Sequence, residues 1–258
     1  MSGHLRLEID GPIARLLIDR AAKRNALDQP MWEALPGLVE AAMAAPAVRV
    51  LVVTSAQPGL FCAGADIAEF AAMSRDPDWR RRNQAAIRST QVTLARAAKP
   101  VIAAIDGDCI GGGCGIALAC DMRLASPRAR FGITPAKLGL VYPLHDTKLL
   151  VDAVGPAQAK RILFTAALLD AAEAQRIGLA DIVADDLEAA VAALAASIVA
   201  VSPHSQQASK AIVRRILDGA ADDDMASSGQ FDAAFDGADF QEGVAAFLAK
   251  RKPAFPDR

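Results

Sequence analysis

A run of four apolar residues, Val50–Val53, most constrains what this chain can fold into. The run shows no polar alternation, and a strand of that kind is buried on both faces, as in a parallel sheet covered by helices on each side. Other β-rich runs lie at Leu5–Ile9, Ile13–Ile18 and Val101–Ile105, and Ala/Leu-rich helical stretches separate them. This alternation predicts βα units around a largely parallel sheet in the N-terminal half.

Helical patterns are predicted both inside this half and throughout the C-terminal part. Residues 29–44 are expected to form a helix, because Asp28 and Pro30 are typical of a helix start and Pro46 follows its end. From about Thr147 onward strand signals almost vanish. The helices predicted there span residues 147–154, 156–164, 171–177, 187–200, 203–217 and 239–250.

Composition and charge limit the class of protein. The 258 residues are 53% hydrophobic and 22% charged, which allows one large domain, or one domain with an appendage. A formal net charge of −2 gives no electrostatic reason to expect a nucleic acid or an anionic membrane as partner. The first residues are charged where a signal peptide is apolar, and no apolar run approaches the roughly 18 residues of a membrane span. We therefore expect a soluble, cytoplasmic protein.

Two smaller features concern the cysteines and a polar stretch. Cys62, Cys109, Cys114 and Cys120 lie among Ala, Gly and Leu residues without the paired spacing of a zinc site. We expect buried free thiols and no metal, with a metal site or a disulfide as the alternative. The Asp, Ser and Gly residues between 222 and 229 are typical of turns, so this segment is the best candidate for a linker.

Two tight, small-residue turns each follow a β-rich run, at residues 61–66 (FCAGAD) and 111–115 (GGGCG). Glycines let the backbone turn sharply and can leave amide N–H groups unpaired where a helix starts. Such amides stabilise an oxygen that carries negative charge, and two of them from separate turns could form an oxyanion hole.

Other interpretations of the glycines stay open. They could serve only to let helix and sheet pack closely. A dinucleotide site fits poorly, because residues 107–115 do not match GxGxxG in register and no acidic residue follows about 20 positions later. The phosphate-binding GxxxxGK[ST] motif is absent from the sequence.

Six segments, taken together and in their order, carry a resemblance to a known family. They are RNALD (24–28), FCAGADIAEF (61–70), KPVIAAIDGDCIGGGCGIALACDMRLAS (99–126), FGITPAKLGL (131–140), AAEAQRIGLADIV (171–183) and FQEGVAAFLAKRKPAF (240–255). With them the chain resembles the crotonase superfamily, also called the enoyl-CoA hydratase/isomerase family, over nearly its whole length.

The resemblance implies an α/β fold of the ClpP/crotonase-like type, with repeated ββα units over residues 1–200. It also implies a helical trimerisation region over residues 201–258, and assembly as trimers or dimers of trimers. The implied activity is that of an enzyme acting on a coenzyme A thioester, with no cofactor beyond the coenzyme A of the substrate.

The resemblance also implies which residues form the site. The substrate carbonyl would be held by the backbone amides of Ala65 and Gly112, which agrees with the interpretation of the two turns. The coenzyme A moiety would pass the two N-terminal motifs and reach the C-terminal helix of a neighbouring subunit. The positions matched for coenzyme A are Lys23, Ala63, Asp66, Ile67, Phe247 and Lys250. The alternative for Lys250 is a solvated helix end.

The chain departs from a typical hydratase of this family at two catalytic positions. A typical hydratase of this family has a glutamate at each of these positions. This chain has Gly115 and Pro135 there, and neither residue can move a proton. Decarboxylation needs an initial base least, because loss of carbon dioxide leaves the enolate directly. The segment 134–143 resembles methylmalonyl-CoA decarboxylases, in which a tyrosine matches Tyr142. We therefore expect a lyase of that type, with Tyr142 contacting the acyl group, or alternatively a tyrosine packed in a loop.

Two other functions remain open. One is hydration or isomerisation with non-standard acid/base groups, for which Glu69, His145 and Asp146 are candidates. Their plainer interpretations are a surface position for Glu69, an exposed loop for His145, and for Asp146 the N-cap of a helix that starts at Thr147. The other is a protein that binds acyl-CoA without turning it over.

Overall fold

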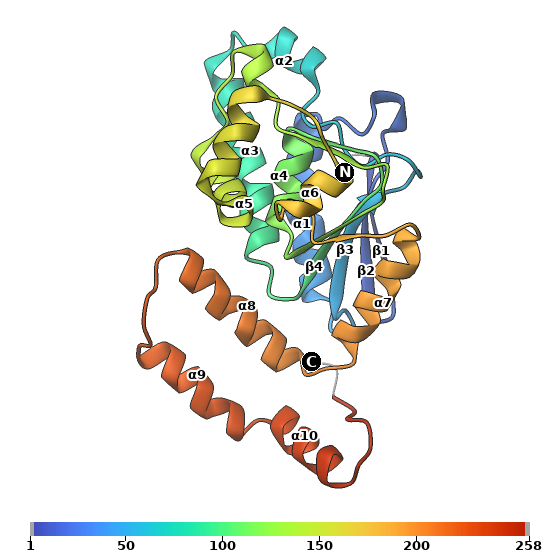
Figure 1. The fold of residues 1–258 in the computed structure, drawn as a ribbon, viewed down its shortest axis with the longest axis vertical. Coiled ribbons are helices and arrows are strands. Elements are labelled where there is room, and N and C mark those ends of the chain that lie inside the picture. Colours follow the sequence, from blue (N-terminus) through green and yellow to red (C-terminus); the bar gives the residue numbers. More distant parts are fainter. Residues whose placement is uncertain (1–2, 256–258) are drawn as a thin grey trace.

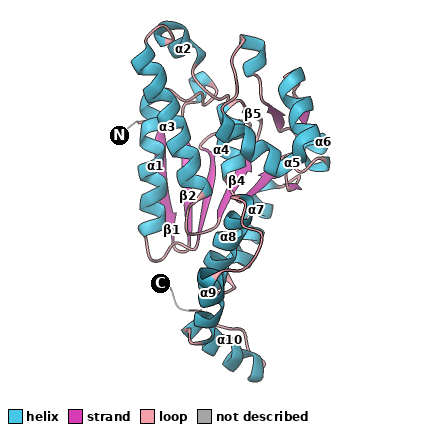
Figure 2. Ribbon diagram, turned by 90° about the vertical axis from the view of Figure 1, so that its left-hand side faces the viewer, coloured by secondary structure: helices cyan, strands magenta, loops and turns pink. Residues whose placement is uncertain are grey.

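The computed structural model describes residues 3–255, which form a mixed α/β core and a helical extension (Figures 1 and 2). The main sheet has the strand order β1-β2-β3-β4-β6-β9. Strands β1 and β2 form an antiparallel hairpin, and all other neighbours in this sheet are parallel. Its strands are β1 (Leu5–Asp10), β2 (Ile13–Ile18), β3 (Val50–Ser55), β4 (Val101–Ile105), β6 (Met122–Ala125) and β9 (Ile182–Val183).

A smaller sheet has the order β5-β7-β8 and lies next to the glycine-rich turns. The core helices cover the sheets and include two short 3-10 turns. The remaining core elements are β5 (Asp108–Ile110), β7 (Arg130–Gly132), β8 (Leu169–Asp170), η1 (Ala21–Lys23), η2 (Pro135–Leu138), α1 (Gln29–Ala44), α2 (Ile67–Met73), α3 (Pro77–Ala95), α4 (Gly112–Ala119), α5 (Leu144–Thr165), α6 (Ala171–Arg176) and α7 (Leu187–Val199).

The strand β3 is buried on both faces, as its unalternated sequence predicts. Leu51 and Val53 belong to the large core cluster that includes residues of α1 and α4. Val50 and Val52 belong to a second cluster with residues of α7. The main sheet therefore lies between α1 and α4 on one side and α7 on the other (Figure 1).

Helix α1 has the bounds that the sequence predicts. The Asp28 carboxylate accepts a hydrogen bond from the Met31 amide at 3.1 Å and so caps the first turn. Pro36 lies inside the helix and lacks the N–H that would bond to the carbonyl of Trp32. The Thr90 hydroxyl of α3 donates to that carbonyl instead, at 3.0 Å. The proline is therefore tolerated because a neighbouring helix satisfies the carbonyl it leaves free.

The proposed linker between residues 222 and 229 is wrong, because most of it lies in a helix, α9 (Met225–Phe235). Asp224 accepts hydrogen bonds from the amides of Ala226 and Ser227, and the Ser227 hydroxyl accepts one from the Asp224 amide. These residues form a capping box, a helix start built from the same residue types that favour turns.

Helices α8 (Pro203–Leu217), α9 and α10 (Ala238–Leu248) extend away from the sheets (Figure 2). Lys210 of α8 attaches them to the core by donating to the Lys99 carbonyl at 3.0 Å and to Asp121 at 2.7 Å. The extension exposes large apolar side chains, most of all Met225, Phe231, Phe247 and Leu248. The division into residues 1–200 and 201–258 stays a prediction.

Two further findings concern membranes and thiols. Within residues 3–255 no single helix is long and apolar enough to cross a membrane; α7 and α8 pass that test only together, and they are bent by 104°.

All four cysteines are buried free thiols, as expected. Burial raises the pKa of Cys62 and of Cys120 to about 12, so both are protonated near neutral pH.

Candidate active site

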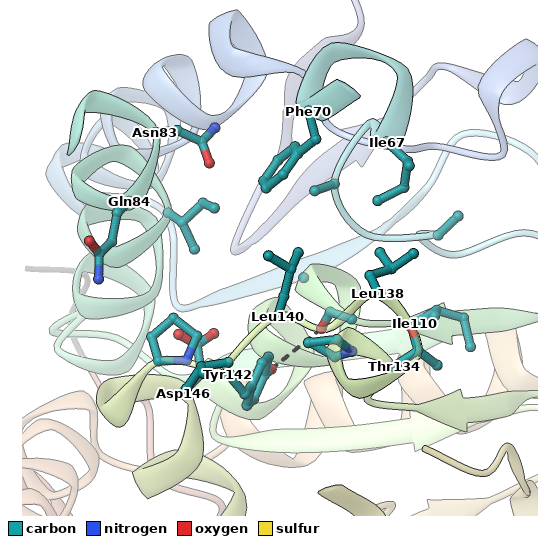
Figure 3. A pocket seen from close by; sticks show the side chains of 18 of the residues that line it. Ile67, Phe70, Asn83, Gln84, Ile110, Thr134, Leu138, Leu140, Tyr142 and Asp146 are labelled. Carbon is teal, nitrogen blue, oxygen red and sulfur yellow. Dashed lines mark hydrogen bonds between the residues drawn. The ribbon is translucent and has the colours of Figure 1, made fainter. Parts of the chain in front are cut away.

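A cavity of about 1040 Å³ lies between α2 and α3 on one side and the segment around residues 134–146 on the other. Ile67 and Phe70 of α2 face Leu138 and Leu140 across it (Figure 3). The start of α4, at Gly112, also lines the cavity. A concave, largely apolar site with a few polar groups is typical of a small-molecule binding site.

The first glycine-containing turn directs one amide away from its own chain neighbours. The Leu27 amide donates to the Gly64 carbonyl at 2.7 Å, and the Asp66 amide donates to the Leu27 carbonyl at 2.9 Å. Ala65 lies between Gly64 and Asp66 in this parallel pairing, so its N–H points away from Leu27. Gly64 has a φ of +92°, which only glycine adopts without strain.

The second turn presents the first amide of a helix. Gly112 is the first residue of α4, and an N–H at that position has no partner within the helix. Gly111 precedes it with a φ of +54°. Within residues 3–255, neither the Gly112 N–H nor the Ala65 N–H donates a hydrogen bond to a protein acceptor.

The two turns converge on one wall of the cavity. A Cβ atom on Gly112 would lie 3.6 Å from the Ala65 nitrogen, and one on Gly64 would lie 3.0 Å from the Gly112 nitrogen. Both Ala65 and Gly112 line the cavity. Two adjacent N–H groups without protein acceptors can hold a single oxygen atom of a ligand, and their dipoles stabilise negative charge that develops on it.

The residues matched for coenzyme A are only partly brought together. Ala63 and Ile67 line the cavity, whereas Lys23 does not, although the adjacent Arg24 does. The Asp66 carboxylate does not line it either: it caps α2 and pairs with Arg20 at 2.8 Å. Burial raises the pKa of Asp66, but hydrogen bonds from Arg20 and from the α2 amides outweigh burial, so the net shift is downward.

The C-terminal pair lies apart from the cavity of its own chain. Phe247 belongs to α10 and is 83% exposed, and Lys250 follows that helix. Neither residue lines the cavity, and α10 lies at the opposite end of the molecule from α2 (Figure 1). Within one chain these two residues therefore cannot contact a ligand bound in the cavity.

Tyr142 lies in the cavity wall. Its hydroxyl donates to the Gly111 carbonyl at 3.4 Å, one residue before the Gly112 amide. Burial, reinforced by the nearby charge of Asp146, raises the pKa of Tyr142 well above its ordinary value. The phenol is therefore neutral near pH 7 and keeps the proton that it donates to the Gly111 carbonyl.

Two sequence interpretations around the start of α5 are wrong. The helix begins at Leu144 with Pro143 as its N-cap, so Asp146 is not the cap of a helix that starts at Thr147. His145 does not lie on an exposed loop: it belongs to the first turn of α5, is half-buried and lines the cavity. Burial lowers the pKa of His145, which favours the neutral imidazole.

Asp146 is one of the candidate acid/base residues that the sequence indicated. Its carboxylate is buried, lines the cavity and accepts a hydrogen bond from the Gln91 side-chain amide of α3. Burial raises the pKa of Asp146, and the hydrogen bond from Gln91 offsets only part of that effect. Glu69, by contrast, accepts from the Gln29 amide at 2.9 Å and does not line the cavity.

The two positions that lack glutamates differ in what surrounds them. Pro135 opens η2 and lines the cavity. Gly115 lies inside α4, where a Cβ atom would overlap the Gln91 amide and lie 2.9 Å from Asp146 Oδ1. Sequence reasoning missed Gln91, because nothing local in the sequence links it to Asp146, 55 residues away.

The comparisons with known proteins decide the family. A family profile described as enoyl-CoA hydratase/isomerase matches residues 8–258. The chain belongs to this family. A crystal structure of an enoyl-CoA hydratase/isomerase family protein from Hyphomonas neptunium is similar over 100% of this chain and 99% of that chain, with 40% identity and a TM-score of 0.96. The crotonase fold expected from the sequence is thereby confirmed.

Two curated relatives of this enoyl-CoA hydratase/isomerase family member carry named activities. A crotonyl-CoA hydratase of Syntrophomonas wolfei is 36% identical over 255 residues, which cover 96% of each chain. A mitochondrial methylglutaconyl-CoA hydratase of Mus musculus is 39% identical over 176 residues, 68% of this chain and 55% of that protein. The family is one of enzymes that act on acyl-CoA thioesters, and this chain is an acyl-CoA enzyme of that kind.

Within residues 3–255 no group of three or more His, Cys, Asp or Glu side chains is placed to hold a metal ion.

Proposed function

We propose that the protein binds a short acyl-CoA thioester and stabilises its enolate between the N–H groups of Ala65 and Gly112. The observation that carries this proposal is the convergence of two amides without protein acceptors on one wall of the cavity. One donor of an oxyanion hole contributes about 3–4 kcal/mol to lowering a reaction barrier. Two such donors support large rate enhancements whichever bond is broken to form the enolate.

The reaction proposed first is addition of water to the double bond of a short enoyl-CoA. The apolar side chains of Ile67, Phe70, Leu138 and Leu140 suit a short acyl chain, and the named activities of the relatives are hydrations. Decarboxylation of a methylmalonyl-type thioester is the second candidate. It is favoured by Gly115 and Pro135, which cannot carry protons.

The two reactions are separated by supplying crotonyl-CoA and methylmalonyl-CoA to the purified protein. We expect the enoyl absorbance of crotonyl-CoA to disappear as 3-hydroxybutyryl-CoA forms, with no carbon dioxide released from methylmalonyl-CoA. Carbon dioxide release without hydration would establish the second candidate. Tight binding of both thioesters without any product would instead indicate a binding protein.

For coenzyme A we propose contacts from the rim of the same cavity. Ala63 and Ile67 line it, and Lys23 lies next to Arg24, which also lines it. Asp66 would contribute indirectly, by capping the helix that carries Ile67. We propose that no cofactor is needed beyond the coenzyme A of the substrate.

We propose that the chain assembles as a trimer or a dimer of trimers, and that Phe247 and Lys250 reach the coenzyme A bound to a neighbour. The exposed apolar side chains of α9 and α10, and the distance of both residues from their own cavity, support this proposal. Light scattering should give three or six times the chain mass of 26.9 kDa. Phe247→Ala should weaken thioester binding about tenfold by removing aromatic contact area. A monomer that turns over thioester at full rate would contradict the assembly.

A further inference from the structure

A buried carboxyl group faces the cavity from the first turn of α5. Asp146 is 3% exposed, and its partner Gln91 is fully buried. The charge of the same carboxyl contributes to raising the pKa of Tyr142. Figure 3 shows Asp146 beside Tyr142 on the wall opposite Phe70. Removing a carboxyl group from water is unfavourable, so a buried one is expected where it has hydrogen-bonding partners or a chemical role.

The carboxylate occupies the space that a side chain at residue 115 would need. Gly115 follows Gly112 by one turn of α4, so a side chain there would start near the two cavity amides. Instead, Asp146 Oδ1 lies 2.9 Å from where the Cβ atom of residue 115 would be, and the Gln91 amide fills the rest. The space left by the missing side chain of α4 is therefore occupied by a carboxylate from α5.

Unsatisfied polar atoms lie at the same place. Within residues 3–255, buried Gln91 Oε1 and His145 Nε2 have no hydrogen-bond partner. Buried polar atoms normally have partners, and exceptions call for an explanation such as a bound water or a substrate group. His145 lines the cavity, so its free Nε2 is a second observation, independent of the carboxylate, that a polar ligand group is bound here.

We infer that Asp146 transfers the proton at the α-carbon of the thioester, in place of the side chain that residue 115 lacks. This inference rests on the proposed function, because the enolate needs the Ala65 and Gly112 amides. In hydration, the Asp146 carboxylate takes a proton from water as the water oxygen bonds to the β-carbon. The π electrons of the double bond move into the enolate. The enolate then takes that proton from the Asp146 carboxyl at its α-carbon, and the carboxylate is restored.

The environment of Asp146 suits such a role. A group that both accepts and returns a proton works best when its pKa lies near the working pH. Burial moves the pKa of Asp146 upward, in that direction. Because Gln91 Oε1 is free, the amide can turn over and accept a hydrogen bond from an asparagine at position 146. Asp146→Asn is therefore expected to fold and to bind thioester.

The experiment follows exchange of the α-protons of butyryl-CoA, a saturated thioester that cannot be hydrated, in D2O by NMR. Asp146→Asn should slow the exchange about 100-fold or more, since general acid–base groups contribute that much. Its melting temperature and its affinity for butyryl-CoA should stay close to those of the unsubstituted protein. The matched control is Asp152→Asn, an exposed aspartate of the same helix paired with Lys148 at 2.6 Å, which should exchange at the full rate.

A second variant keeps the test decisive if the asparagine variant does not fold. Asp146→Ala leaves room for a small carboxylate, and added formate should raise the exchange rate of this variant at least about tenfold. Exchange by Asp146→Asn within about fivefold of the unsubstituted rate, or no formate rescue of Asp146→Ala, overturns the inference. If the unsubstituted protein hydrates crotonyl-CoA without exchange, the inference also fails and the proposed function stands. If it neither exchanges, nor hydrates crotonyl-CoA, nor releases carbon dioxide from methylmalonyl-CoA, the proposed function itself is wrong.

Discussion

Replacing Gly112 with alanine is expected to lower kcat/KM for the acyl-CoA substrate by about 10²–10³, the loss typical of one oxyanion donor. The added methyl group would lie 2.9 Å from Trp32 Cζ2 and 3.6 Å from the Ala65 nitrogen. Trp32 is fully buried and packed, so the backbone at Gly112 must shift instead, and its N–H then leaves the position that faces the substrate oxygen. Steady-state kinetics with crotonyl-CoA measure this effect.

Gly37→Ala is the matched control, because it makes the same chemical change in α1, the helix that carries Trp32. Gly37 is exposed and has no atom within 4 Å of its would-be Cβ. This variant should keep full activity and gain about 0.5–1 kcal/mol of stability, since alanine is the better helix former. Full activity of Gly112→Ala would show that the Gly112 amide does not contact the reacting group.

Gly64→Ala is expected to lower the free energy of unfolding by about 2–5 kcal/mol and to abolish measurable turnover. The backbone at Gly64 has a φ of +92°, and a Cβ atom there would lie 2.6 Å from the Ile110 carbonyl oxygen. The carbonyl oxygen belongs to the backbone and the position of the Cβ atom is fixed by the backbone at residue 64, so neither atom can rotate away. The turn must open, which separates the Ala65 amide from Gly112. Chemical denaturation and crotonyl-CoA kinetics report the two effects.

Gly11→Ala separates backbone strain from the clash. Gly11 also has a positive φ, +54°, but nothing lies within 4 Å of its would-be Cβ. We expect a loss of about 1 kcal/mol and no change in activity. If Gly64→Ala cost no more than Gly11→Ala, the close approach of the two turns would not exist in solution.

Several elements could be predicted because their causes are local in the chain. The apolar run at Val50–Val53 requires burial on both faces, and the two core clusters provide it. Asp28 and Pro30 start α1 at the predicted residue. The residues of the two glycine-rich turns could be selected because positive φ and an unpaired helix-start amide depend on the identity of a few adjacent residues.

Other features could not be predicted because the same residue types serve opposite purposes. Asp, Ser and Gly near residue 224 suggest a linker, yet Asp224 and Ser227 cap α9. Aspartate is a residue type typical of helix caps, yet Asp146 lies inside the first turn of α5 and contacts Gln91 of α3. Local composition does not distinguish these uses, since packing by distant segments selects between them.

The sequence alone determined the α/β architecture and the two glycine-rich turns, because strand burial, helix starts and glycine turns depend on neighbouring residues, and its six matching segments indicated the family. Only the tertiary structure decided that the space beside Gly115 holds a carboxylate from another helix. It also decided that Phe247 and Lys250 lie away from the cavity of their own chain. Such relations depend on how helices pack around the sheet, and that packing joins residues far apart in the chain.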